Sequence, residues 1–219
     1  MTFVEVLIKN SSDIWEQYLE HPFTNGVVDG TMDAEKFKNY IIEDSIYLNA
    51  YARAFAGGMY NSTRREDLQF FYKSLTFIEE GEGSTRVYYL KKYNLTDEWI
   101  DQQEPKPENK EYIDFMLGVA KDGTALETWM AILPCIFSYA YIFRELTKSA
   151  QVDESNPYKK FLDDYISENY HNYCVECGKY VNKLASQINM TPEYKDKLSN
   201  IFRKSSLCEL EFWNMANRK

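Results

Sequence analysis

Cys135 directly follows a proline in the most apolar stretch of the chain, residues 129–143. A proline inside a helix removes one intrahelical hydrogen bond and pushes on the carbonyl four residues back, here that of Met130. Cysteine is the side chain best suited to act as a nucleophile with little help. Tyr139 lies four residues further on and shares the same helix face. The stretch therefore predicts a kinked helix with a thiol and a phenol side by side, either as a site or as an unusual piece of core.

Two carboxylates occupy positions where the helical period calls for apolar side chains. Asp44 falls in the middle of the apolar face of a helix predicted over residues 34–60, and Glu209 fills a gap in the stripe of the last helix. Glu43, one position round from Asp44, is expected at the surface, and Glu211 falls off its stripe. A buried carboxylate needs a partner or a proton. The two stripes consist of Phe37, Tyr40, Ile41, Tyr47, Leu48, Tyr51 and Phe55, and of Leu198, Phe202, Ser205, Phe212 and Ala216.

The inward thiol and acids point to nucleophilic and acid–base chemistry in one place. One acid can hold a ligand in its ionised form, and the other can carry a proton, because burial favours the protonated carboxyl. Tyr47, Tyr112 and Tyr165 lie on the apolar faces of three different helices. The alternative interpretation is structural: each acid pairs with an internal lysine or arginine or caps a neighbouring helix, and the tyrosines are ordinary core.

The other cysteines favour packing over a metal or redox site. Cys174 and Cys177 form a C-x-x-C pair, but a redox pair of this kind needs a βαβ setting that the pattern lacks. A zinc site would combine the pair with His171, and with Cys208 as a further ligand. The pair also belongs to an apolar helical stripe, which favours both thiols as small buried hydrophobes.

The two histidines give little support for iron. Glu168-Asn-Tyr-His171 matches the Glu-x-x-His spacing of di-iron bundles, but those bundles need two such pairs on separate helices. His21 has Tyr18 rather than an acid three residues before it. Haem binding needs only one histidine, yet neither histidine has a supporting pattern. We therefore predict no metal and no cofactor.

Helices alone are expected to position these residues, because apolar residues recur at spacings of three and four and alternating β-branched runs do not occur. A capping box, Thr124-x-x-Glu127, begins the Cys135 helix. The sequence predicts an all-α, single-domain bundle of about seven helices over residues 1–219. Helices are expected over about 3–20, 34–60, 64–80 (broken at Gly81 and Gly83), around 112–122, from 124, from Asn156-Pro157, from Ser167, and from Thr191-Pro192 to about 216. Turns are expected at 25–30, and a polar loop over 94–107.

Charge and hydropathy exclude several classes of partner. The formal net charge of −9 argues against a nucleic-acid or anionic-membrane surface, since both need clustered positive charge. The N-terminus lacks the basic start and the long apolar run of a signal peptide. The longest uncharged stretch, 128–143, is too short to span a bilayer. We expect a cytoplasmic protein with reduced thiols.

Four motifs follow one another along nearly the whole chain. They are His21-Pro-Phe23 with Gly26 and Asp29-Gly30, the helix from Tyr40 to Arg53, Pro134-Cys135-x-x-x-Tyr139, and Glu209-x-x-Phe212-Trp213-x-Met-Ala216. Each motif is modest alone, but in this order and at these separations they are specific and resemble the TenA family of thiaminase II or aminopyrimidine aminohydrolase enzymes. Two segments depart from the family pattern: Phe161-Leu162 replaces a usual Trp-Ile, and 81–89 lacks a histidine often seen there.

The resemblance implies a fold shared with haem oxygenases, assembled as a homotetramer. It implies hydrolysis at the exocyclic methylene of 4-amino-5-aminomethyl-2-methylpyrimidine, and of thiamin, to give 4-amino-5-hydroxymethyl-2-methylpyrimidine in thiamin salvage. By motif, Cys135 is the nucleophile, Glu209 the proton donor and Tyr47 an aid to the thiol, while Asp44 binds the aminopyrimidine edge and Tyr112, Tyr139 and Tyr165 line the pocket.

The expected nucleophile needs support, because a thiol among apolar side chains is ordinarily inert. An ionised Asp44 nearby would disfavour the thiolate further. A hydrogen bond from Tyr47 or from a main-chain amide is the expected remedy. Two other functions stay open at this stage: a non-catalytic pyrimidine-binding regulator, and a haem or iron protein on the same fold.

Overall fold

The structure is a computed structural model that describes residues 1–80, 82–150 and 152–218, and within these residues every regular element is a helix. Short helices explain why twelve are present where the sequence predicted about seven. They are α1 (Phe3–Lys9), α2 (Ser12–Glu20), α3 (Pro22–Val28), α4 (Ala34–Tyr60), α5 (Arg65–Glu80), α6 (Glu82–Lys92), α7 (Asp97–Ile100), α8 (Pro107–Asp122), α9 (Ala125–Leu146), α10 (Lys159–Ile166), α11 (Glu168–Ser186) and α12 (Pro192–Asn217).

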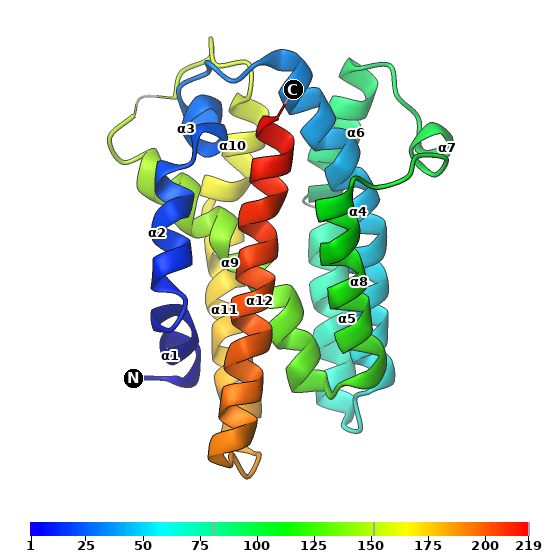
Figure 1. The fold of residues 1–219 in the computed structure, drawn as a ribbon, viewed down its shortest axis with the longest axis vertical. Coiled ribbons are helices and arrows are strands. Elements are labelled where there is room, and N and C mark those ends of the chain that lie inside the picture. The colour runs from blue at the N-terminus through cyan, green and yellow to red at the C-terminus, as the bar shows by residue number, and fades with distance from the viewer. Residues whose placement is uncertain (81, 151, 219) are drawn as a thin grey trace.

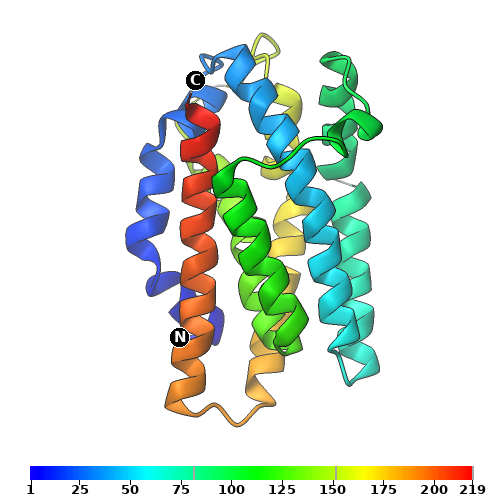
Figure 2. The same cartoon turned by 45° about the vertical axis from the view of Figure 1, so that its right-hand side comes forward.

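The long helices run side by side along the long axis of the molecule (Figure 1). Helix α9 lies at the centre and packs against α4, α8, α11 and α12. The short helices α1, α2 and α3 follow one side next to α12, and α7 projects from the opposite side, as both views show (Figure 2). The buried apolar side chains form one continuous cluster. The bundle therefore brings helices from both ends of the chain against α9.

Side-chain caps begin several helices at the predicted residues. The capping box at Thr124 is present, with the Thr124 hydroxyl accepting from the amide of Glu127 and the Glu127 carboxylate accepting in return. Ser167 caps α11, and Thr191 caps α12 with Pro192 in the first turn. These caps satisfy amide groups that a helix start leaves without partners, so these starts are set locally.

Three predicted boundaries were wrong for local reasons. The first helix is interrupted after Lys9, because Asn10 and the following serines favour caps and turns over helix interiors. The predicted turn at 25–30 is mostly helix α3, which His21 caps through Nδ1 and which starts with Pro22. Asn156 does not cap α10, which begins at Lys159; its amide donates to two carbonyls of α3 instead.

Two further segments differ from the expected pattern around α6 and α7. Gly83 lies inside α6, and Gly81 lies outside the described residues. The polar loop over 94–107 contains a short helix, α7, which Thr96 caps by accepting from the amide of Trp99. Both segments lie beside α4, the helix that carries Asp44.

Pro134 lies inside α9, and hydroxyl groups from other helices bind the neighbouring backbone. The Ser205 hydroxyl on α12 donates to the carbonyl of Ala131 at 2.7 Å, and the Tyr51 hydroxyl on α4 donates to the carbonyl of Ile132 at 2.8 Å. Proline weakens the hydrogen-bond ladder of its own helix, and buried carbonyls need donors. Two hydroxyl donors from α12 and α4 therefore support the backbone of α9 just before Cys135.

Helix α9 is long and apolar enough to cross a membrane by length and composition, with a mean hydropathy of 1.4 over its most apolar window. Within the bundle 94% of that window is buried by other helices. The apolar character of α9 is thus that of a central core helix.

Candidate active site

Helices α4, α8, α9 and α12 line a small cavity at the centre of the bundle. Its interior has room for about one water molecule. Six of the seven predicted site residues line this cavity, although they come from four helices. The lining consists of Asp44, Tyr47, Tyr112, Cys135, Tyr139, Glu209 and Phe212.

Glu209 on α12 links the thiol to a phenol. Its side chain is 2% exposed, and its Oε1 accepts a hydrogen bond from the Tyr112 hydroxyl at 2.7 Å. Burial raises the pKa of Glu209 to about 7, against the opposing effect of hydrogen bonds from Tyr112 and from the Cys135 thiol. The partner of Cys135 is therefore a carboxyl that gains and loses a proton near neutral pH.

Asp44 on α4 is half-buried and borders the same cavity. Desolvation raises the pKa of its carboxyl to about 7, and the charge of Arg86 on α6 opposes that rise. Arg86 itself is largely buried and donates to Asp97, the first residue of α7, at 2.6 Å. The charge of Arg86 therefore acts on Asp44 while its ion pair is with Asp97, and Asp44 faces the cavity.

The phenols of Tyr112 and Tyr47 pack together beside the thiol. Their ring centroids lie 4.8 Å apart, and both side chains are buried. The Tyr112 hydroxyl also lies 3.1 Å from the Ser205 hydroxyl, which donates to the carbonyl of Ala131, so these hydroxyls join Glu209 to the backbone of α9. The Tyr47 hydroxyl donates to the sulfur of Met116 at 3.8 Å. Tyr47 thus lies close to Cys135, and the expected hydrogen bond from Tyr47 to the thiol stays a prediction.

Tyr139 lines the cavity, whereas Tyr165 packs behind it. The two ring centroids lie 4.7 Å apart, and Tyr165 is not among the residues that form the cavity wall. Two residues that the sequence did not single out as site residues contact the Tyr139 hydroxyl, namely Tyr40 and Trp213. Phe212 was also missed, although its position three residues after Glu209 on one stripe could have identified it.

Glu43 is buried, which contradicts the expected surface position. Its carboxylate accepts from the amide of Lys106 at 3.1 Å and from the side chain of Asn109 at 2.9 Å. The adjacent loop and the start of α8 cover this face of α4. Glu43 therefore lies on the polar side of α4 but is buried against α8. Glu43 therefore fastens α8 to α4 next to Asp44.

The remaining cysteines and histidines lie apart from this cavity. Among the described residues, no group of three or more His, Cys, Asp or Glu side chains has the arrangement of a metal site. Cys177 is fully buried, and burial raises its pKa to about 12. His21 caps α3 and binds Asn214 through Nε2, so its ring nitrogens are both engaged. The zinc, di-iron and haem alternatives thus gain no support from the side-chain arrangement.

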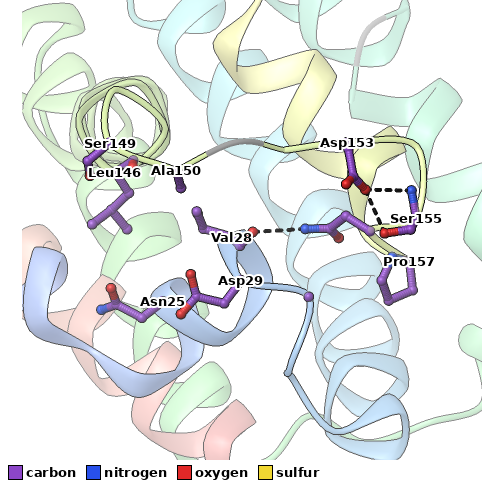
Figure 3. A pocket seen from close by; sticks show the side chains of 11 residues that line it. Asn25, Val28, Asp29, Leu146, Ser149, Ala150, Asp153, Ser155 and Pro157 are labelled. Carbon is purple, nitrogen blue, oxygen red and sulfur yellow. Dashed lines mark hydrogen bonds between the residues drawn. The ribbon is translucent and has the colours of Figure 1, made fainter.

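A larger open pocket lies at the surface between α3 and the segment after α9 (Figure 3). It brings in the carboxylates of Asp29 and Asp153, but its described lining residues include no thiol. Its polar groups are largely bonded to one another, since Asn156 donates to Val28 and Ser155 donates to Asp153. The small central cavity is therefore the better candidate for chemistry.

A family model, a sequence relative and a solved structure all relate this chain to one protein family. A family model described as the TENA/THI-4/PQQC family matches residues 8–219. An aminopyrimidine aminohydrolase of Helicobacter pylori is 29% identical, with 99% of each chain covered. A solved structure of a TenA homologue from P. horikoshii OT3 is 32% identical, with a TM-score of 0.83 and coverage of 99% of this chain and 98% of that chain.

The fold prediction is confirmed by a more distant structure as well. A domain of unknown function with a haem oxygenase-like fold from Shewanella denitrificans OS217 is 17% identical, with a TM-score of 0.68. It covers 97% of this chain and 91% of that chain, which extends the likeness in fold over nearly all helices. With an all-helical bundle, a match over residues 8–219 and the four sequence motifs in place, this chain belongs to the TENA/THI-4/PQQC family.

Proposed function

We propose that this protein is an aminopyrimidine aminohydrolase, a hydrolase that cleaves C–N bonds in thiamin metabolism. Its proposed substrates are 4-amino-5-aminomethyl-2-methylpyrimidine and, more slowly, thiamin. Family membership and a relative named for this activity support the reaction class. Cytoplasmic location and homotetrameric assembly stay predictions of the family resemblance.

One observation carries the proposal: Cys135 and Glu209 line one small cavity, which Asp44 also borders, and the thiol lies close enough to lower the pKa of the Glu209 carboxyl. A buried thiol alone is inert, but a carboxylate with a pKa of about 7 can accept its proton near neutral pH. Nucleophile and base within hydrogen-bond reach are the usual arrangement in covalent catalysis. Glu209 thus replaces Tyr47 as the proposed source of the thiolate.

The proposed reaction proceeds by addition and elimination. The Cys135 proton passes to Glu209 as the sulfur adds to the electron-poor ring, and Glu209 returns that proton to a ring nitrogen of the adduct. The amine reacts in its protonated ammonium form and departs from the exocyclic methylene as ammonia. A water molecule then adds to the methylene and releases a proton to solvent. Expulsion of the sulfur restores the aromatic ring and releases the hydroxymethyl product, and the ring-nitrogen proton returns through Glu209 to Cys135. Covalent addition divides one difficult displacement into easier steps.

Asp44 is the proposed acceptor for the amino group of the ring. An ionised carboxylate accepts two such hydrogens, and Arg86 favours that ionised form. A buried acceptor rejects rings that lack the amino donor, because the carboxylate would be left unpaired. Tyr112, Tyr139 and Phe212 would then hold the ring by its faces and edges.

Binding requires the cavity wall to move, since the cavity has room for about one water molecule and a pyrimidine ring is larger. Rotamer changes of lining side chains are common on ligand binding. A closed site would exclude bulk water, which strengthens the electrostatic contacts of Asp44 and Glu209.

The test is a substrate panel with product identification. The purified protein should release ammonia from the aminomethylpyrimidine and form the hydroxymethylpyrimidine, with slower cleavage of thiamin. Tight binding of the pyrimidine without any turnover would instead identify a non-catalytic regulator. Absence of both binding and turnover would refute the proposal.

A further inference from the structure

The Tyr139 hydroxyl borders the cavity and contacts two polar groups behind it. Its oxygen lies 2.9 Å from the hydroxyl oxygen of Tyr40 on α4 and 3.3 Å from the indole Nε1 of Trp213 on α12. Tyr40 and Trp213 are both fully buried, at 0% exposure. Three helices, α4, α9 and α12, therefore meet at one phenol oxygen.

The direction of each proton follows from the donors and acceptors present. An indole N–H can only donate, so Trp213 occupies one acceptor position of the Tyr139 oxygen. Within the described part of the chain, Tyr139 is the only hydrogen-bond partner of the Tyr40 hydroxyl. A buried hydroxyl proton without an acceptor is costly, so Tyr40 donates to Tyr139 and fills its second acceptor position. The Tyr139 proton is then directed away from both donors.

Aromatic packing fixes the rings that carry these hydroxyls. The Tyr40 ring lies 4.9 Å from the ring of Phe23 and 5.8 Å from that of Phe212, measured between centroids. The Tyr139 ring is held by Tyr165 at 4.7 Å and by Trp213 at 5.6 Å. Because neighbouring rings hold these side chains in place, the position of the Tyr139 hydroxyl proton depends only on rotation about its C–O bond. The donors Tyr40 and Trp213 restrict that rotation.

We propose that Tyr40 and Trp213 are positioning residues that hold the Tyr139 O–H as a fixed donor toward an acceptor nitrogen of the bound ring. The inference rests on the proposed function and deepens it. Asp44 and Tyr139 line the same cavity, which has room for about one water molecule. The cavity thus presents a hydrogen-bond acceptor, the Asp44 carboxylate, together with a donor, the Tyr139 O–H. This pair is complementary to a ring that carries an amino group next to an acceptor nitrogen. An aminopyrimidine has that edge, whereas the matching aminopyridine with C–H beside the amino group lacks the acceptor.

The test compares these two rings, the hydroxymethylpyrimidine product and its aminopyridine analogue, by calorimetric binding. Tyr40→Phe should weaken pyrimidine binding about 3–10-fold, the size of one neutral hydrogen bond, and change analogue binding less than about twofold. Tyr139→Phe should abolish the discrimination between the rings. Tyr158→Phe is the matched control, because Tyr158 is a buried tyrosine that donates to the carbonyl of Met32 away from the cavity. It should leave the ratio of the two affinities unchanged.

An equal loss for both rings in Tyr40→Phe would show a merely structural role and overturn the proposal, as would no change for either ring. Neutron diffraction of the ligand-free protein tests the proton direction independently of any ligand. The deuteron between the two phenols should belong to Tyr40, and that of Tyr139 should point into the cavity; the reverse assignment would refute the inference. If the wild-type protein binds neither ring, the proposed function fails, while the neutron map still decides the role of Tyr40.

Discussion

Cys135 and Cys177 are both buried thiols on long helices of the core, yet their surroundings differ. Cys135 on α9 borders a cavity together with Glu209, whose pKa burial raises to about 7. Cys177 on α11 is fully buried, and burial raises its pKa to about 12. In the described part of the chain the carboxyl that acts on this thiol is that of Glu176, which is exposed to solvent and paired with Lys73 rather than buried like that of Glu209.

The comparison teaches that burial and helix position do not by themselves make a thiol reactive. Desolvation disfavours the thiolate at any buried site. What distinguishes Cys135 is a neighbouring group that takes up a proton near neutral pH, together with space for a ligand. The following predictions test that distinction, from the largest expected effect to the smallest.

Removing the two thiols should have opposite consequences. Cys135→Ala should lower the rate of aminopyrimidine hydrolysis by on the order of 10³-fold or more, because the nucleophile is lost, with the helical circular dichroism signal unchanged. Cys177→Ala should keep the activity and lower the free energy of unfolding by about 1–2 kcal/mol through lost packing. Equal losses of activity in the two variants would remove the distinction between the thiols.

Replacing the base should separate activity from stability. Glu209→Gln should lower kcat about 10²–10⁴-fold, the usual contribution of a positioned acid or base. Burial raises the pKa of Glu209 to about 7 in the folded protein, above its ordinary value in the unfolded chain. Between these two pKa values the folded protein binds more protons than the unfolded chain. The free energy of unfolding therefore falls as the pH rises through this range.

The ionised Glu209 therefore destabilises the fold above about pH 7, and glutamine removes that cost. At about pH 8, Glu209→Gln should unfold at a higher urea concentration than the wild type, and its free energy of unfolding should be larger by roughly 1–3 kcal/mol. Below about pH 4 the variant and the wild type should be equally stable. A variant that is less stable at the higher pH would contradict the assigned burial of this carboxyl.

Arg86 should set the acid limb of the pH–rate profile. Asp44 acts in its ionised form, so kcat/KM should fall as the pH drops through its pKa of about 7. Glu209 has a pKa in the same range, so the two carboxyls titrate together. Arg86→Met should move this limb to higher pH by about one unit, because the favourable charge is lost. Arg86→Lys should restore much of the original profile. If the acid limb of the pH–rate profile stays in place in Arg86→Met, Arg86 serves only in the ion pair with Asp97 and does not act on Asp44.

The smallest effect concerns the backbone before Cys135. Tyr51→Phe removes the side-chain donor to the carbonyl of Ile132, and the loss of this one buried hydrogen bond should cost about 0.5–1.5 kcal/mol of unfolding free energy. We expect kcat to fall by only a few fold, since packing still holds the helix. Chemical denaturation and steady-state kinetics would measure both changes, and a large loss of kcat would give Tyr51 a role in aligning Cys135.

The sequence was most informative where a local pattern carries its own physical cause. The periodicity of 34–60 and the caps at Thr124, Ser167 and Thr191 set helices that the structure confirms. The same periodicity identified Asp44 and Glu209 as polar residues on inward faces. It was weaker for short helices such as α3, where the unusual cap His21 gives little composition signal.

The sequence by itself thus determined an all-helical chain and the faces on which a thiol, two acids and several phenols lie. The packing of the bundle decided which faces meet: Glu209 lies close to the thiol, Tyr165 packs behind Tyr139, and Glu43 is covered by α8. The reason is that helical periodicity fixes a residue's direction relative to its own helix axis. Distances between helices, desolvation and hydrogen-bond partners depend on the neighbours, which only the tertiary structure supplies.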